Sequence, residues 1–237
     1  MIGTLINVGT ILLGSFLGIL VGKRLSDRLR NTIIAGLGLF TFGYGIMAFI
    51  DTENALVPLG GLLIGALLGE WWKLEEGLEK AGGFLRDRFV RKGSDEAQQG
   101  QFVEGFVTAS LVFVIGPIAI LGSIQDGLTG DFEMLAIKAV LDGFASIAFA
   151  SSLGMGVAFS ALSILIYQSA ITLLASFFSL YFSAAMMNEM TAVGGLVLMA
   201  IAISSLLGIR KIRTGSFLPA LLITPLIVWV LERFFGG

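Results

Sequence analysis

Long apolar stretches separated by short polar loops limit most strongly what this chain can fold into. Eight of them follow one another, at 1–22, 33–50, 55–69, 102–124, 132–150, 156–182, 190–209 and 217–235. A bilayer core about 30 Å thick is crossed by roughly 20 apolar residues in a helix. With 56% hydrophobic and 14% charged residues, the chain could not cover the surface of a water-soluble globule. We therefore predict an all-α polytopic transmembrane bundle of about eight spans.

Two residue types, histidine and cysteine, are absent from the chain. Their absence excludes disulfides, thiolate or imidazole catalysis, the usual zinc sites and protein-ligated iron–sulfur clusters. We therefore expect no metal site and no cofactor. The partners we expect are the lipid bilayer and a small solute or cation, and not a nucleic acid.

Basic residues are concentrated in alternate loops between the predicted spans. The loops after the first, third and seventh spans hold 13 of the 15 Lys and Arg residues. The intervening loops are acidic or neutral, with Asp51, Asp126, Asp131 and Glu189 among their acids. Cytoplasmic loops of membrane proteins are enriched in Lys and Arg, so we expect the basic loops in the cytoplasm and both termini outside.

Residues 70–101 differ from the rest of the chain because charged residues dominate them. Apolar residues recur there at helical spacing, at Leu74, Leu78, Ala81, Leu85 and Phe89. This pattern predicts an amphipathic helix at the cytoplasmic membrane surface, followed by a polar linker. The other predicted parts are spans one to three in 1–69, spans four and five in 102–150, and spans six to eight in 156–237.

Two parts of the chain resemble one another. Residues 10–18 align with 171–179, Gly38 with Gly195, and Val57-Pro58 with Leu218-Pro219. The alignment relates spans one to three to spans six to eight, so each span would run opposite to its counterpart. An inverted three-helix repeat of this kind is typical of secondary transporters. The general similarity of apolar helices is the alternative explanation.

Two charges lie inside the fifth predicted span. Asp142 lies near its middle, and Lys138 precedes it by four residues, on the same helical face and within reach of a salt bridge. A charge in hydrocarbon is costly and is a functional candidate by default. The pair either serves a proton, a cation or a solute, or only neutralises itself. These charges also leave open whether the fifth span crosses the membrane or is re-entrant.

A break in the fourth span is the second candidate site. Pro117, after Gly116, removes a helical hydrogen bond and clashes with the preceding turn. Unpaired backbone groups at membrane depth are tolerated where they line a cavity, and they can bind ions or solutes. The turn that contains Gln125 and Asp126 is predicted at the outer mouth of this site. A simple proline kink is the alternative.

Uncharged polar residues also occur inside the spans. Gln168, Asn7, Ser160 and Ser163 either form hydrogen bonds between helices or contact a substrate. The third span carries glycines at Gly61, Gly65 and Gly69, a spacing that allows close helix packing and makes a homodimer plausible.

Several segments resemble a known family. They are Phe106–Ser110, Gly116-Pro117, Ile120–Gly127, Leu141–Gly143, Gly154–Val157 and Tyr167-Gln168, with Gly3–Asn7 near the N-terminus. These motifs are similar to those of an uncharacterised prokaryotic inner-membrane family, domain of unknown function 554. The resemblance extends over nearly the whole chain and implies a multi-pass plasma-membrane protein, for which transport is often suggested. It implies no substrate and no functional residues.

The sequence thus predicts a transporter or channel for a small solute or ion, coupled to a cation, with its site near Asp142 and the break in the fourth span. The excess of acids on the outer side weakly favours a cation. One alternative is a structural or regulatory protein whose segment 70–101 binds a partner or anionic lipid. An intramembrane enzyme is not expected. Without His or Cys it would need a Ser–Lys or paired-aspartate site, and Asp142 and Asp126 are predicted to lie too far apart in depth to form an aspartate pair.

Overall fold

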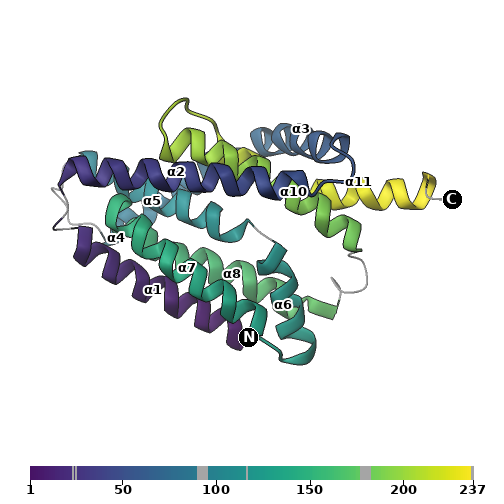
Figure 1. Cartoon of the computed structure of the whole chain (residues 1–237), viewed down its shortest axis with the longest axis horizontal. Helices are drawn as coiled ribbons and strands as arrows, with labels where there is room; N and C mark the ends of the chain where they lie inside the picture. The colour runs from purple at the N-terminus through teal and green to yellow at the C-terminus, as the bar shows by residue number, and fades with distance from the viewer. Residues whose placement is uncertain (23, 25, 90–95, 116, 177–182, 236–237) are drawn as a thin grey trace. The chain divides into compact units, whose positions relative to one another are not determined.

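The computed structural model describes residues 1–22, 24, 26–89, 96–115, 117–176 and 183–235. This part of the chain is helical and contains no strand (Figure 1). Its helices are α1 (Ile2–Gly22), α2 (Asp27–Ile50), α3 (Leu56–Trp71), α4 (Leu74–Phe89), α5 (Glu96–Val114), α6 (Pro117–Thr129), α7 (Glu133–Leu153), α8 (Gly156–Leu173), α10 (Ala184–Ile201), a π-helix (Ala202–Leu206), a 3₁₀ helix (Thr214–Phe217) and α11 (Ala220–Phe235). In hydrocarbon every backbone N–H and C=O group must be paired inside the protein, and a helix pairs them within one segment.

Each of the eight predicted spans corresponds to an apolar helix or helix pair. Six described segments are long and apolar enough to cross a membrane. The fourth predicted span is a pair of helices, Gln99–Val114 and Ile118–Thr129, bent by 64°. The third is the shorter apolar helix Leu56–Trp71, of 16 residues. The predicted all-α membrane bundle is therefore confirmed.

Three helices begin earlier than the hydropathy pattern predicts. Helix α2, the second predicted span, begins at Asp27 instead of Ile33. Helix α5 begins at Glu96, inside the segment predicted to be a polar linker. Helix α10, the seventh predicted span, begins at Ala184 instead of Met190. Ser183 caps α10, because its hydroxyl oxygen accepts a hydrogen bond from the backbone N–H of Met186 at 3.2 Å. At these span ends the helices continue through the polar residues that flank the apolar stretch.

Contacts divide the chain into two compact units. Unit 1 contains Met1–Leu37 and Glu79–Leu180, and unit 2 contains Gly38–Leu78 and Tyr181–Gly237. The spans of unit 1 are α1, α5, α6, α7 and α8, and those of unit 2 are α3, α10, α11 and the second half of α2. Each unit therefore combines helices from both halves of the chain.

Glycines bring α1 and α7 of unit 1 into close contact. A Cβ atom on Gly14 would lie 2.2 Å from the carbonyl oxygen of Gly143. A Cβ atom on Gly18 would lie 2.3 Å from the carbonyl oxygen of Ile147. The partner on α7 advances by four residues when the glycine on α1 does, so the two helices run parallel. Parallel directions agree with the prediction that the first and fifth spans cross the membrane in the same sense.

The bent pair of α5 and α6 extends from one end of unit 1 to the other. Near the start of α5, Gln101 Nε2 donates a hydrogen bond of 2.7 Å to the carbonyl oxygen of Ser152, just before α8 begins at Gly156. Near the end of α6, Gly127 packs against Thr172, near the end of α8. The pair thus begins and ends level with α8. One broken span that follows the length of α8 would make these contacts at its two ends.

Small residues also set the packing within unit 2. Along α3, Gly61, Gly65 and Gly69 meet Thr224, Ala220 and Ser216 in that order. The partner numbers fall as the glycine numbers rise, so α3 and α11 are antiparallel. On α2 and α10, a Cβ atom on Gly45 or Gly195 would lie within 2.6 Å of the other glycine's carbonyl oxygen. Gly38 meets Leu207 beyond the end of α10, so α2 and α10 are also antiparallel.

The buried carboxylate of Glu189 on α10 holds the loop between α2 and α3. It accepts hydrogen bonds from Thr52 Oγ1 at 2.6 Å and from the backbone N–H groups of Glu53 at 2.9 Å and Asn54 at 3.2 Å. Only 4% of Glu189 is exposed. This acid was predicted to be one of the charges of the outer loops, and the structure shows that it is a buried structural residue.

We expect Glu189→Ala to destabilise this loop. It removes three hydrogen bonds to a charged acceptor, each of which contributes about 1.5–3 kcal/mol. Faster amide hydrogen exchange at residues 52–54 and easier proteolysis of the loop should report the change. The matched control is Glu232→Ala, which removes an exposed carboxylate of the same unit that accepts a hydrogen bond from Ser183. Equal exchange rates in the two variants would contradict this role of Glu189.

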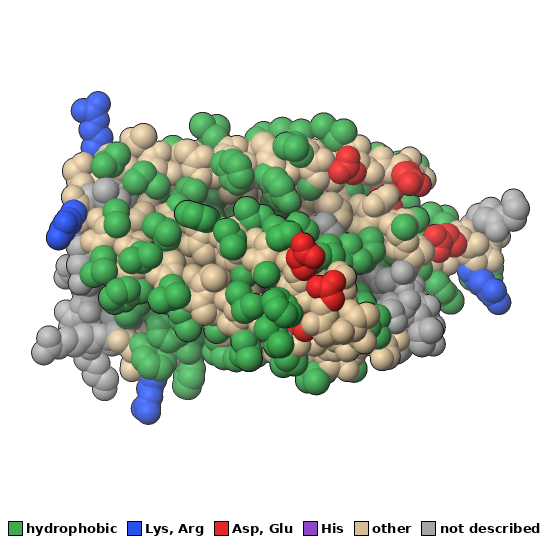
Figure 2. Space-filling view, turned by 60° about the horizontal axis from the view of Figure 1, so that its bottom comes forward, with side chains coloured by type: hydrophobic (Ala, Val, Ile, Leu, Met, Phe, Trp, Pro, Cys, Tyr) green, Lys and Arg blue, Asp and Glu red, His purple; other side chains and the backbone are tan. Residues whose placement is uncertain are grey.

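Hydrophobic side chains remain exposed along the described helices. On α1, Leu5, Leu13 and Phe16 are each at least 60% exposed. In the face shown in Figure 2, hydrophobic side chains are spread over the surface between backbone and uncharged polar atoms, and charged side chains are few. Membrane-embedded helices with such surfaces contact lipid, so the bilayer is the partner of these faces.

Candidate functional site

A row of polar side chains on α7 points into unit 1. Lys138, Asp142 and Ser146 are spaced four residues apart, so they share one face of the helix. All three are buried, with 7%, 8% and 0% of their surfaces exposed, respectively. The Lys138 ammonium and the Asp142 carboxylate are in direct contact, as the sequence predicts. Asp142 is the tenth of the 21 residues of α7, so the ion pair lies in the middle of the helix.

Asn7 on α1 completes the environment of this ion pair. Its Nδ2 donates a hydrogen bond of 3.0 Å to Asp142 Oδ2, the same oxygen that contacts Lys138. Asn7 has no exposed surface. The close approach of α1 and α7 at Gly14 places the two helices near enough for this contact. Asp142 is therefore held by one charged and one neutral donor.

Several fully buried polar atoms of unit 1 have no hydrogen-bond partner among the described residues. In unit 1 they are Thr4 Oγ1, Asn7 Oδ1, Ser15 Oγ, Ser146 Oγ, Thr172 Oγ1 and both Nε2 and Oε1 of Gln168. A buried polar group without a partner costs about 1–3 kcal/mol, so such groups normally bind water or a ligand. Gln168 stands out because it is 0% exposed and both of its polar atoms lack a partner.

Asn7 and Gln168 lie at the same depth in unit 1. At the start of α1, the backbone N–H of Gly3 donates a hydrogen bond to Asp126 at 3.2 Å. The residue after Asp126 packs against Thr172, near the end of α8, so α1 and α8 are antiparallel. Asn7 is four residues from Gly3 and Gln168 is four from Thr172, which is about 6 Å along each helix. Asn7 of α1, Lys138 and Asp142 of α7 and Gln168 of α8 therefore lie near one level, and we call these four residues the polar cluster. Thr172 lies about one turn to one side of this level and Ser146 about one turn to the other.

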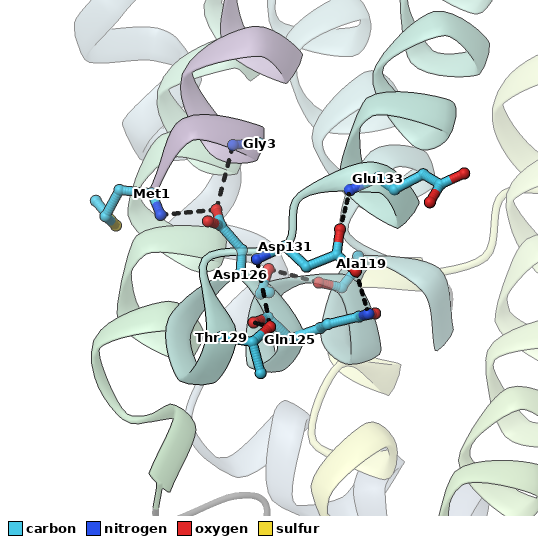
Figure 3. A network of polar contacts seen from close by, with 9 residues as sticks. Met1, Gly3, Ala119, Gln125, Asp126, Thr129, Asp131 and Glu133 are labelled. Atoms are coloured by element: carbon cyan, nitrogen blue, oxygen red, sulfur yellow. Dashed lines mark hydrogen bonds and ion pairs between the residues drawn. The ribbon is translucent and has the colours of Figure 1, made fainter.

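Asp126 lies at one end of this cluster, at the end of α6 (Figure 3). It is 5% exposed, and its Oδ2 forms an ion pair of 2.7 Å with the Met1 ammonium group and accepts the Gly3 N–H. Gln125 is directed to Asp131, to whose carboxylate its Nε2 donates a hydrogen bond of 2.7 Å (Figure 3). Asp126 binds Gly3 and Asp142 binds Asn7, and these two residues of α1 are one helical turn apart, so the two carboxylates lie about one turn apart in depth. The side chain of Gln125 instead forms an exposed hydrogen bond with Asp131.

The remaining predicted site residues lie at the break of the fourth span. Pro117 is the first residue of α6, the helix position that tolerates proline best. Gly116 lies outside the described residues. Of the predicted set, the structure brings Lys138 and Asp142 into contact, places the buried Gln168 level with Asn7, and places Asp126 at the end of the polar cluster.

Four buried, unpartnered hydroxyl side chains of unit 1, Thr4, Ser15, Ser146 and Thr172, were not among the predicted site residues. The available signal was their spacing. Thr4, Asn7 and Ser15 recur along one face of α1, and Ser146 follows Asp142 by four residues. Hydroxyl side chains are common in membrane helices, so this spacing singles them out only when the facing helix is known.

The comparisons agree with the resemblance found in the sequence. The family described as "Protein of unknown function (DUF554)" matches residues 2–229. The chain belongs to the DUF554 family. It is 33% identical over 239 residues to the "Uncharacterized membrane protein YdfK" of Bacillus subtilis (strain 168), covering 99% of this chain and 98% of the relative. It is 32% identical over 222 residues to the "Uncharacterized protein YqgA" of Escherichia coli (strain K12), covering 94% of each chain. No solved structure matches this member of the DUF554 family significantly.

Proposed function

We propose that this membrane protein transports a small solute across the plasma membrane and that the solute binds at the polar cluster of unit 1. The observation that carries the proposal is Gln168, a fully buried amide with two unpartnered polar atoms level with Asn7. A carboxylate, an ammonium group and several hydroxyls accompany it in the middle of a bundle of spans. Polar groups at this depth are expensive and are typical of substrate and ion pathways.

The directions of the helices support an inverted repeat as the basis of this transport. The repeat relates α1 to α8, α2 to α10 and α3 to α11. Within unit 1 the first pair is antiparallel, and within unit 2 the other two pairs are antiparallel. Inverted repeats let a transporter open alternately to its two sides, and a broken helix, here α5 and α6, is a recurrent part of such sites.

The charges at the helix ends support an orientation with both termini outside. In unit 1, Asp126 and Glu133 lie at the end where α1 begins, whereas Arg24 follows the end of α1. In unit 2, Arg213 lies at the opposite end from the loop that Glu189 holds, where it contacts Glu70 and Glu76. Lys and Arg favour the cytoplasmic side.

Gln168→Met tests the proposed site because it separates binding from packing. The substitution keeps the volume and removes an unpartnered amide, so we expect the free energy of unfolding to rise by about 1 kcal/mol. If Gln168 binds the solute, flux should fall at least tenfold. Flux is measured by light scattering of proteoliposomes, with inward gradients of urea, glycerol, sodium chloride and potassium nitrate.

The matched control is Ile166→Met, on the exposed face of the same helix, which should leave both quantities unchanged. Flux of the wild-type protein no faster than that of empty liposomes would contradict transport of these solutes. Unchanged flux in Gln168→Met would remove Gln168 from the site.

A further inference from the structure

The polar cluster has no net charge of its own. Helices α1 and α8 contain no Asp, Glu, Lys or Arg, so Lys138 and Asp142 of α7 are the charged members of the cluster. The other described titratable side chains on α7 and on the helices packed against it are Glu133, Glu104 on α5, Asp126 on α6 and Tyr167 on α8. Glu133 and Glu104 are exposed, and Asp126 is paired with the Met1 ammonium group.

A neutral buried ion pair restricts what the site can accept. An added anion that takes over the Lys138 ammonium leaves the Asp142 carboxylate buried and unpaired. A proton added to Asp142 leaves the Lys138 ammonium unpaired. Either state is strongly unfavourable, because the uncompensated charge is held away from water. Both events together leave one ion pair and one neutral acid, so the total charge of the site does not change.

On this basis, which rests on the proposed transport function, we propose that the site takes up a proton together with a monovalent anion. The proton, supplied by water on the entry side, forms an O–H bond on Asp142. The Lys138–Asp142 ion pair breaks, and Lys138 forms a new ion pair with the anion. Release on the other side reverses both steps and returns the proton to water. The cycle moves no net charge across the membrane.

The donors around the pair favour an anion over a metal cation. Lys138 Nζ has three N–H donors, of which one serves Asp142. The unpartnered amide of Gln168, which lies level with Asn7, can donate to an oxygen of the same anion. A bound metal cation would have to displace the ammonium group from Asp142 and remain beside it. Within the described residues, no group of three Asp, Glu, His or Cys side chains could hold a metal ion instead.

Thr4 supplies a route for the proton from one end of unit 1. Its buried, unpartnered hydroxyl belongs to the turn of α1 between Gly3, which binds Asp126, and Asn7, which binds Asp142. A hydroxyl both donates and accepts hydrogen bonds, so it can relay a proton between these two levels. The relay involves no histidine, in keeping with a chain that has none.

The test uses the full chain in proteoliposomes loaded with a pH-sensitive dye. Chloride, nitrate or methanesulfonate is applied as an inward gradient against gluconate, with valinomycin and potassium setting the membrane voltage. We expect internal acidification with at least one anion, at a rate that does not change when the voltage is varied. The flux of the anion itself is measured separately, by an ion-selective electrode or a radiolabel.

Single variants test separately the uptake of the proton by Asp142 and the binding of the anion by Lys138. Asp142→Asn should reduce acidification at least tenfold, and Lys138→Gln should reduce anion flux to a similar extent. Because either variant leaves one buried charge unpaired, the neutral double variant Lys138→Gln/Asp142→Asn provides a folded reference that should lack both activities. Glu133→Gln, at the exposed start of the same helix, is the control and should match the wild type.

The outcomes distinguish this inference from the proposed function. Anion flux that follows the voltage without acidification would overturn proton coupling while leaving transport intact. Internal alkalinisation under an inward sodium or choline gradient would overturn it in favour of cation–proton exchange. Proton-coupled flux that persists in the double variant would also overturn it. Movement of none of the probes, here or in the light-scattering assay, would count against the transport function itself.

Discussion

Asp142→Asn should lower the free energy of unfolding by about 3–5 kcal/mol, whereas Lys138→Met/Asp142→Asn should remain within about 1 kcal/mol of the wild type. The single variant leaves the Lys138 ammonium buried with no opposite charge, since α1 and α8 contribute none. The double variant removes both charges and keeps an oxygen at position 142 that can accept the hydrogen bond from Asn7. Unfolding in mixed detergent micelles, followed by Trp fluorescence, measures the difference.

This double-variant comparison separates charge compensation from other contributions of the pair. A double variant as unstable as Asp142→Asn would contradict the claim that an unpaired charge causes the loss. A single variant as stable as the wild type would show that Lys138 loses its proton or reaches water when Asp142 is neutral. In either case the charge balance on which proton–anion coupling rests would fail.

Gly14→Leu is expected to prevent the close packing of α1 on α7. A Cβ atom at this position would lie 2.2 Å from the backbone oxygen of Gly143, and backbone cannot move aside as a flexible side chain can. Overpacking of a tight contact costs about 1–3 kcal/mol and more where backbone must shift. We expect the upper end of this range, with loss of the contact between Asn7 and Asp142. Thermal unfolding in detergent and the yield of monodisperse protein report the effect.

Gly9→Leu is the control for this substitution on the same helix. A Cβ atom on Gly9 would have no neighbouring atom within 4 Å, so the larger side chain should be accommodated. In an apolar helix, replacement of glycine also improves helix propensity. Equal loss of stability in the two variants would mean that the α1–α7 contact is not the cause.

Much of the architecture could be predicted from hydropathy and charge. Apolar stretches of sufficient length form helices in a membrane because no other segment-local structure pairs the backbone there. The i, i+4 spacing of Lys138 and Asp142 was sufficient to predict their ion pair, since the geometry of a single helix brings them together. Helix ends were less predictable. From the sequence, Glu189 was predicted to lie in an outer loop. In the structure it is buried and accepts hydrogen bonds from a loop more than 130 residues away.

The candidate site, too, was predicted only in part from the sequence. The amino-acid pattern alone shows a membrane protein with a buried charge pair, because hydropathy and helical periodicity act over at most one helix. It does not show that Asn7 meets Asp142, 135 residues away, or that Gln168 lies level with both. Those contacts depend on how closely α1 can approach α7 and on the directions of α1 and α8, which the packing of whole helices sets. The long apolar stretches therefore determine that the chain spans the membrane, and helix packing determines which polar groups share its interior.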